Sequence, residues 1–469
     1  MPPKRRKRQK TGTALTVDRK YKGLGDAFTL EFFIKGLAPN IQEEFREIGH
    51  CVELMAFPDL KYGWTKIPKE VVTGLRFSNM NNKMSPLNRL FAWQGPLLYI
   101  YNLRNETYTV VELGANIRYA DGIDDITCYA ILENNTIVRI INNQVNAVYG
   151  YSGSCGEMYR GRLFIGDGKV LRFSSPAISD PNFTGDPFAT ANGGGWIILS
   201  YPNVTQIVDL RVINDMLYIF TDGGLFFLTS AMTSNVPSSF YLSETGLKWS
   251  FERNKILSIH KKCMVVSEMG LFELITANLE RKSLVVDNLF PELDTAKSGL
   301  SYHREQNFLI IPYRNQNKSL CYSFEYDLFF NLPFKVEQAV FSTQGKAYGL
   351  VNGYFSKLFQ EAIYYPFVVK TVYHNLGVDR FKFLREIQLR ASARCHVYVF
   401  YDGFGVEQGA ISMGAYYGDL WSYRNPFNRK GNKISFYFAE ATEDRDFYLS
   451  LVKVKGHILG EPYYFYGAV

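Results

Sequence analysis

Seven times between Phe91 and Phe359 the chain runs an apolar, β-prone stretch into a short turn and returns through a second such stretch. The turns are rich in Gly, Asn and Asp, which tolerate the positive φ that tight hairpin loops require. A spacing of about 43 residues separates successive turns, which is typical of one propeller blade. The turn centres lie near Gly95, Asn134, Asp167, Asp222, Met269, Gln316 and Gly353. Because an isolated hairpin cannot bury its faces, the repeat predicts blades stacked in a ring.

We therefore expect an all-β protein built on a β-propeller of six or seven blades. The 469 residues exceed the ~300 that such a propeller uses, which leaves room for smaller flanking parts. An aromatic content of 16% suits pleated, stacked sheets. The pattern divides the chain into a disordered basic leader (1–12), an N-terminal arm or partial blade (13–84), the propeller (85–360) and a small C-terminal β-sandwich-like domain (361–469).

The predicted C-terminal domain contains a long alternation of apolar and polar residues from Arg380 to His396. Period-two alternation predicts a half-buried antiparallel strand. Its polar face carries Lys382, Arg390 and Arg394. This cationic row is a candidate surface for DNA or an acidic partner, with a solvated strand face as the alternative.

The net charge of +7 is concentrated at the start of the chain. Six of these charges fall within the first ten residues, at Lys4, Arg5, Arg6, Lys7, Arg8 and Lys10, so the remaining body is about +1. Such a leader attracts phosphates by counterion release or docks on an acidic partner. The alternative is a solubilising or nuclear-import-like tail without a specific site.

The cysteine pattern predicts free thiols. Six cysteines are scattered without a C-x-x-C pair, and no apolar secretion signal is seen near the start. This fits a chain made in a reducing cytosol. No apolar run approaches the ~20 residues that cross a bilayer, so no membrane span is expected.

Residues for catalysis are sparse. No histidine has a neighbour at metal-ligand spacing, and H-E-x-x-H and phosphate-loop motifs are absent, so we assign no catalytic residue, metal or cofactor. A propeller glycosidase would need two carboxylates roughly 5–10 Å apart. The candidates are Asp121, Asp124, Asp125, Asp180 and Asp186. Acids in loops more often form turns by accepting nearby backbone N–H groups, so we expect a protein that is not an enzyme.

The longest insertion between hairpins runs from Ser174 to Gln206 and contains three consecutive glycines, Gly193 to Gly195. Loops of this length are usually functional or ordered by a partner. A flexible connector is the alternative interpretation.

One group of segments is more specific than the blade period. The segments are MYRGRLFI from Met158 to Ile165, LRFS from Leu171 to Ser174, and DPNF from Asp180 to Phe183. Together they resemble the blade motif of tail nozzle and packaged-DNA stabilisation proteins of short-tailed bacteriophages. The similarity spans about residues 85 to 455. The residues that match the motif are Gly161, Arg162, Leu163, Ser174, Asp180 and Pro181.

The motif also has a physical interpretation. We expect Gly161 to let the strand start close against its neighbour, and Arg162 to span blade edges. A surface salt bridge is the alternative for Arg162. Strand alternation places Leu163 and Ile165 on one face and directs Phe164 into the adjacent sheet.

The resemblance implies a structural virion protein of the phage tail, assembled in the host cytoplasm. Members of the family form a cyclic homo-oligomer, with a hexameric ring favoured, that extends the portal–adaptor channel. In this role the protein contacts the portal, the adaptor and other tail proteins, retains packaged DNA in the channel, and takes part in genome ejection.

Two other functions stay open at this stage. The first is a receptor- or glycan-binding propeller of the virion that uses exposed tryptophans as anchors, with Trp64, Trp196, Trp249 and Trp421 as candidates. The second is a propeller glycosidase.

Overall fold

A computed structural model describes most of the chain. The described residues are 14–18, 26–39, 49–59, 63–81, 89–230, 240–259, 262–275, 277–294, 300–303, 307–341, 346–374, 382–393, 395–401, 414–417, 420–424, 430–431, 433–440 and 447–458. The basic leader and Arg394 lie outside them.

Among these residues, seven four-stranded sheets follow one another along the chain. The first three contain β7 (Asn79–Met80), β8 (Arg89–Gln94), β9 (Leu97–Asn102), β10 (Thr107–Glu112); β11 (Ile117–Gly122), β12 (Thr127–Leu132), β13 (Ile137–Ile141), β14 (Gln144–Tyr149); and β15 (Cys155–Tyr159), β16 (Arg162–Asp167), β17 (Val170–Phe173), β18 (Gly195–Ile198). The next three contain β19 (Ile207–Ile213), β20 (Met216–Thr221), β21 (Leu225–Ser230), β22 (Phe240–Glu244); β23 (Ile256–Ile259), β24 (Lys262–Ser267), β25 (Gly270–Ile275), β26 (Asn278–Arg281); and β27 (Ser301–His303), β28 (Phe308–Pro312), β29 (Ser319–Ser323), β30 (Leu328–Leu332). The seventh contains β31 (Val336–Phe341), β32 (Ala347–Val351), β33 (Tyr354–Tyr364) and β6 (Pro68–Arg76).

The predicted hairpins are confirmed, and each occupies the same place in its sheet. Gly95 lies between β8 and β9, Asp167 ends β16 before β17, and Gly353 lies between β32 and β33. In every case the turn joins the second and third strands of the sheet. The sequence period therefore marks the central hairpin of each blade.

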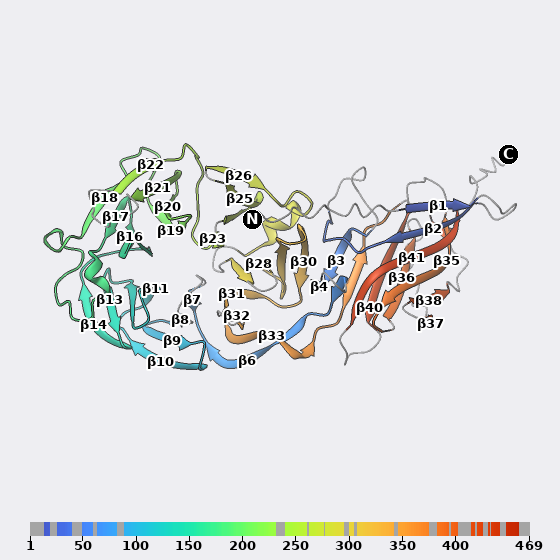
Figure 1. Cartoon of the computed structure of the whole chain (residues 1–469), viewed down its shortest axis with the longest axis horizontal. Helices are drawn as coiled ribbons and strands as arrows, with labels where there is room; N and C mark the ends of the chain where they lie inside the picture. Colours follow the sequence, from blue (N-terminus) through green and yellow to red (C-terminus); the bar gives the residue numbers. More distant parts are fainter. Residues whose placement is uncertain are drawn as a thin grey trace, which may run out of the picture. The chain divides into compact units, whose positions relative to one another are not determined.

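Successive sheets are arranged as the blades of a β-propeller. The first strands of neighbouring blades contact one another in the pairs β11 with β15, β15 with β19, β19 with β23, and β27 with β31. Figure 1 shows the blades from β8 to β26 fanned around a common centre. The prediction of an all-β propeller with six or seven blades is confirmed, since seven of the four-stranded sheets within the described residues form its blades.

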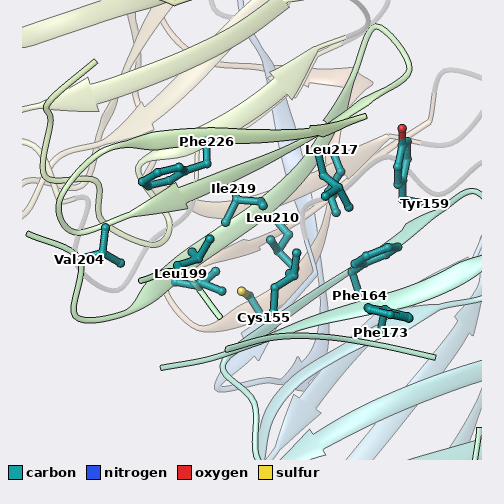
Figure 2. Packing of buried hydrophobic residues seen from close by; sticks show 13 residues of the cluster. Cys155, Tyr159, Phe164, Phe173, Leu199, Val204, Leu210, Leu217, Ile219 and Phe226 are labelled. Carbon is teal, nitrogen blue, oxygen red and sulfur yellow. The ribbon is translucent and has the colours of Figure 1, made fainter. Parts of the chain in front are cut away.

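The hydrophobic core lies between blades. Phe164 and Phe173 of the third blade pack with Leu210, Leu217 and Phe226 of the fourth in one buried cluster (Figure 2). Each blade thus buries one face against the preceding blade and one against the following blade, as stacked sheets with apolar faces must.

The seventh blade takes its outer strand from the opposite end of the propeller sequence. Strand β6 precedes the first blade in the chain yet pairs with β33. The Thr73 hydroxyl of β6 donates to the Phe355 carbonyl of β33 at 2.7 Å. The Arg76 guanidinium lies 4.1 Å from the centroid of the Tyr354 ring. This pairing joins the two ends of the ring.

A second closure lies between the first strands of the seventh and first blades. The buried Gln338 side chain of β31 accepts a hydrogen bond from the Met80 backbone N–H at 2.6 Å and donates to the Asn79 side chain of β7. The Gln338 amide therefore acts as both acceptor and donor to the two residues of the short inner strand of the first blade.

Two further sheets form the sandwich-like part. One has nine strands, the other has four, and the Phe32 and Phe436 rings contact each other 5.7 Å apart, one from each sheet. The nine strands are β1 (Ala14–Asp18), β2 (Asp26–Phe32), β4 (Phe57–Asp59), β5 (Gly63–Thr65), β35 (Lys382–Ala391), β37 (Gly414–Tyr417), β38 (Leu420–Arg424), β39 (Lys430–Gly431) and β41 (Tyr448–Ile458). The four strands are β3 (Cys51–Met55), β34 (Val368–Thr371), β36 (Cys395–Tyr401) and β40 (Ile434–Glu440).

Strands from both ends of the chain therefore build this part. The segment 13–84 contributes β1 to β5 to the two sandwich sheets, and β6 and β7 to two blades. The chain forms two compact units, each held together mainly by its own internal contacts. We call them the sandwich unit (Met1–Lys69, Leu320–Pro333, Phe359–Val469) and the propeller unit (Glu70–Ser319, Phe334–Leu358). Residues Leu320–Pro333 fall in the sandwich unit, where the Leu37 N–H donates to the Phe329 carbonyl at 2.7 Å.

Few other elements occur in the described part. Three short 3-10 helices span Pro176–Ser179 (η2), Thr190–Asn192 (η3) and Asp287–Glu292 (η5). In that part, no helix has both the length and the apolar character needed to cross a membrane. All six cysteines are buried as free thiols, as predicted, and burial raises the pKa of the Cys128 and Cys263 thiols to about 12.

Replacing Gln338 by leucine tests the inner closure. We expect Gln338→Leu to lower the free energy of unfolding by about 1–3 kcal/mol, because the Met80 N–H loses its shorter, buried hydrogen bond and Asn79 loses the donor that Gln338 supplies. Urea denaturation measures the loss. Gln94→Leu, at an exposed position of β8, is the control and should change stability by less than about 0.5 kcal/mol. Equal stability of both variants would contradict the role of Gln338.

Candidate functional site

The motif residues lie together in the third blade. Arg160 and Gly161 form the two-residue turn between β15 and β16, and both have positive φ, 53° and 73°. This conformation is typical of the tight turns that suit β-hairpins. A side chain at Gly161 would meet nothing within 4 Å, so the expected close approach is not the reason for the glycine. The positive φ is the reason.

Arg162 is buried, with 4% of its surface exposed. Its Nη1 donates to the Ser174 carbonyl at 2.7 Å and to the Gly193 carbonyl at 2.6 Å. Both acceptors belong to the same blade as Arg162, so these bonds do not span blade edges as predicted. Burial lowers the pKa of the Arg162 guanidinium. The two charge-assisted hydrogen bonds to carbonyl oxygens hold the side chain in position. The surface salt bridge considered as its alternative does not describe this buried side chain.

Ser174 completes the same connection. Its hydroxyl accepts from the Leu163 N–H at 2.9 Å and donates to the Ser175 carbonyl at 2.8 Å. The Ser174 N–H in turn donates to the Leu163 carbonyl at 2.9 Å. The motif therefore fixes the point at which the chain leaves β17 for the long insertion.

The predicted facing of the motif strand is confirmed. Leu163 and Ile165 are buried in the cluster formed with the second blade, which includes Tyr129 and Ile137. Phe164 lies in the cluster with the fourth blade. The strand is thus buried on both faces.

Asp180 shapes the first turn of the insertion. Its Oδ1 accepts from the Asn182 N–H at 2.9 Å, in the manner of an Asx turn. Pro181 occupies the position between these two residues. The motif thus ends in a turn.

Arg139 of the second blade was not singled out by sequence reasoning. It is buried, and its guanidinium donates to the Asn146 side chain at 2.9 and 2.5 Å and to the Phe183 carbonyl at 2.5 Å. It therefore clamps the insertion of the third blade onto the second blade. A lone arginine in the apolar run of β13 was the available signal.

The three glycines of the insertion are required by geometry. Gly193 has a φ of 84°, and a Cβ on Gly194 would lie 2.5 Å from the Pro187 carbonyl oxygen. A Cβ on Gly195 would lie 2.7 Å from the Phe173 ring. Ile178 and Phe188 of the insertion are buried. The insertion packs tightly on the propeller, unlike the flexible connector considered from the sequence.

Four of the five candidate carboxylates accept hydrogen bonds from nearby backbone N–H groups. Asp124 Oδ1 accepts from the Ile126 and Thr127 N–H groups at 2.9 and 2.7 Å. Asp186 Oδ1 accepts from the Phe188 N–H at 2.9 Å, while its Oδ2 accepts from the Tyr151 hydroxyl. Asp121 and Asp180 likewise accept from the N–H groups of Gly122 and Asn182, and Asp125 offers its carbonyl to Arg89. The turn-forming interpretation is the one that these contacts support.

Metal ligands do not gather in the described part of the chain, where no group of three or more His, Cys, Asp or Glu side chains could hold an ion.

The predicted cationic row in the sandwich unit is only partly described. Arg390 is exposed, whereas Arg394 and the side chain of Lys382 lie outside the described residues. The pairing of β35 with β41 shifts register between Leu384 and Glu386. Leu384 and Ile387 are both buried as a result, so a β-bulge interrupts the strict alternation from which the row was predicted. The six cations of the leader also lie outside the described residues.

The tryptophans proposed as glycan anchors differ in exposure. Trp64 is buried and donates from its indole N–H to the Ile34 carbonyl at 3.0 Å. Trp249 packs edge-on against Phe272 at 5.4 Å. Trp196, on the outer strand of the third blade, is 54% exposed. The side chain of Trp421 lies outside the described residues.

A buried histidine occupies the first strand of the sixth blade. The His303 ring lies 4.8 Å from the Phe308 ring and 4.5 Å from the Phe341 ring, measured between centroids. Burial lowers the pKa of His303 to about 3. The imidazole is therefore neutral in the folded protein near pH 7, and a charged form would destabilise the blade.

Comparisons with known proteins identify no family. No protein-family model and no curated protein sequence matches the chain. Similar solved structures include a streptogramin B lyase (8% identity, 63% of this chain and 97% of that chain, TM-score 0.44), U3-55K (9%, 66% and 99%, 0.41) and a mitotic checkpoint complex (11%, 64% and 94%, 0.42). At this level of similarity they carry no functional argument, and the propeller architecture is defined by the sheets of the chain itself.

Substituting Arg162 tests the connection at the insertion. We expect Arg162→Met to lower the free energy of unfolding by about 2–4 kcal/mol, since the buried Ser174 carbonyl and the partly buried Gly193 carbonyl lose a charged donor. Hydrogen exchange should also speed up between residues 174 and 195. Arg104→Met, at an exposed turn position, is the control and should alter neither quantity. Unchanged exchange in Arg162→Met would contradict the assignment.

His303 should make stability fall in acid. The unfolded chain takes up a proton below about pH 6.5, whereas the folded chain resists it until about pH 3. The unfolded state therefore binds more protons in this window, and stability decreases as pH falls, by up to about 1.4 kcal/mol per pH unit. Denaturation between pH 6.5 and 4.5 should show a shallower slope in His303→Gln than in wild type. Gln94→Leu, at the exposed position of β8, removes no titratable group and is the control, which should keep the wild-type slope.

Proposed function

We propose that the protein is a structural component of a bacteriophage tail, of the nozzle or head-completion type. In this role it extends the portal–adaptor channel, retains packaged DNA and takes part in genome ejection. Copies of the chain form a ring, with six copies favoured by the resemblance of the blade motif. The role is not enzymatic, and it places the protein in the virion after assembly in the host cytoplasm.

The observation that carries this proposal is the apolar perimeter of the propeller unit. On or next to the outer strands of six blades, large apolar side chains are at least 40% exposed. These residues are Val71, Val72, Tyr108, Val110, Val145, Val148, Trp196, Ile198, Tyr241 and Leu284. Val71 and Val72 are adjacent on β6, and Trp196 and Ile198 share β18, and contiguous exposed apolar surface is typical of sites of protein contact. Outer strands also present unpaired backbone groups that another chain can meet.

The motif supports the same role. Arg162, Ser174 and Asp180 are all used to hold the insertion in place. Residues that serve rigidity in this way suit a protein that must keep its shape in an assembly. A neighbouring copy is the partner that we assign to the perimeter, because a closed ring uses the same surfaces in every copy.

The charge distribution fits contact with DNA in transit. The body is near neutral once the leader is set aside. A channel lined with strong positive charge would bind phosphates and slow ejection. The leader, with its six cations, is then the segment suited to hold DNA or an acidic partner.

Exposed Trp196 is the described tryptophan best placed for a glycan. It lies beside Ile198 on the same apolar strand, and we therefore assign it to the interface between copies. A glycan array tests this assignment, because specific binding that Trp196→Ala abolishes would favour the receptor-binding alternative.

Native mass spectrometry of the purified chain tests the ring. We expect a species of six times 53.8 kDa. The double variant Trp196→Lys/Ile198→Lys should shift the population toward monomer, because charge at a buried interface is costly. Met269→Lys, at the exposed turn between β24 and β25, is the matched control and should retain the ring. A monomer at all concentrations would overturn the ring.

Particles assembled without the protein test the role in the virion. We expect such particles to lose packaged DNA, measured as protected genome per capsid. Particles that retain genomes and infect normally would refute the proposed function.

A further inference from the structure

A small cavity lies where the first strands of several blades converge in the propeller unit. Its volume is about 90 Å³. Its lining comes from the first, second, fourth, fifth and seventh blades and from residues next to them. The polar groups that matter are Asn79, Arg118, Asp209, Arg211, Arg253 and Gln338. Because these residues are spread over the unit, only the closed ring brings them together.

A buried ion pair forms one wall of the cavity. The Arg211 Nε and Nη2 donate to Asp209 Oδ2 at 2.9 and 2.8 Å. Asp209 Oδ1 accepts from the Leu210 N–H at 2.9 Å. Both carboxylate oxygens are therefore engaged, and Asp209 is not the group that lacks a partner.

The other edge of Arg211 has a donor left over. Arg211 is 5% exposed, and its buried Nη1 has no hydrogen-bond partner among the described residues. Leaving a charged donor unsatisfied in a buried position is costly. A ligand in the cavity that accepts a hydrogen bond would remove this cost.

Two more guanidinium groups line the cavity. Arg253 lies 5.1 Å from the centroid of the Tyr119 ring, and Arg118 donates to the Gly153 carbonyl at 2.8 Å. The lining thus contains three guanidinium groups and one carboxylate. Asp121 and Glu157 are near, but neither lines the cavity, and Asp121 accepts from the Tyr119 hydroxyl at 3.0 Å.

The amide oxygens of Gln338 and Asn79 are already used. Gln338 Oε1 accepts from the Met80 N–H, and Asn79 Oδ1 accepts from the same N–H and from Gln338. Within the described residues, the buried side-chain atom of the lining that lacks a hydrogen-bond partner is a donor, Arg211 Nη1. The space equals that of about three water molecules, which limits a ligand to a few heavy atoms.

We propose that this cavity, which we call the axial cavity because the first strands of the blades converge on it, binds a small oxyanion. Arg211 Nη1 and Arg253 hold the oxyanion. Charge-assisted bonds from arginine to oxygen anions have the strength and geometry for this task. The site is independent of the proposed role in the tail.

Thermal unfolding of the purified full chain tests the proposal. Inorganic phosphate, sulfate or acetate is titrated at constant ionic strength, with chloride as the reference, and calorimetry measures binding to the same samples. We expect a saturable rise in Tm with at least one oxyanion and a stoichiometry of one per chain. The comparison of phosphate and sulfate with acetate distinguishes a tetrahedral oxyanion from a carboxylate.

Two variants localise the binding. Arg211→Lys keeps the charge beside Asp209 but loses the free edge, and Arg253→Gln leaves the ion pair intact if the first variant does not fold. Each should raise Kd by about tenfold or more. Arg104→Gln, at an exposed arginine, should bind as wild type does. Absence of saturable binding, or equal binding by Arg253→Gln and wild type, overturns the proposal.

Discussion

Closure of the ring is the constraint on which the propeller unit depends. Every residue of β12 and β13 is buried, so these strands have no face to present to water. Such sheets are stable only when a blade covers each side. The first and seventh blades are covered on both sides only if they pack against each other. Gln338 and strand β6 form the contacts between these two ends of the ring. The buried clusters between blades are therefore mutually dependent, and local packing and global topology are stabilised together.

Local sequence patterns revealed the blades well because the central hairpins are local. Each turn near Gly95 or Asp167 joins strands that are adjacent in the chain, so turn chemistry and apolar runs sufficed. The sandwich sheets were harder to predict. Strand β2 pairs with β41, more than 400 residues later, and no local pattern encodes such a partner. The bulge after Leu384 was likewise invisible, because it depends on the register with β41.

In the candidate site, too, local features were predictable from the sequence, whereas contacts between distant segments were not. The sequence correctly placed Leu163 and Phe164 in one strand, and alternation predicted which face of the strand each occupies. The predicted reason for glycine at position 161 was wrong. A close approach of neighbouring chains and a positive φ both favour glycine, so the sequence alone does not distinguish them. The partners of Arg162 and the clamp by Arg139 depend on a folded insertion. The residues of the axial cavity are scattered from Asn79 to Gln338 and meet only across the ring.

The order of synthesis gives the pairing of β6 with β33 a temporal consequence. Strand β6 leaves the ribosome first, whereas its partner begins at Tyr354. At translation rates of roughly 5–20 residues per second, β6 waits on the order of tens of seconds for that partner. During this delay Val71, Val72 and the unpaired backbone of β6 are available to other nascent chains or to chaperones. The earliest propeller strand therefore lacks the partner that covers its backbone edge until β33 has been synthesised.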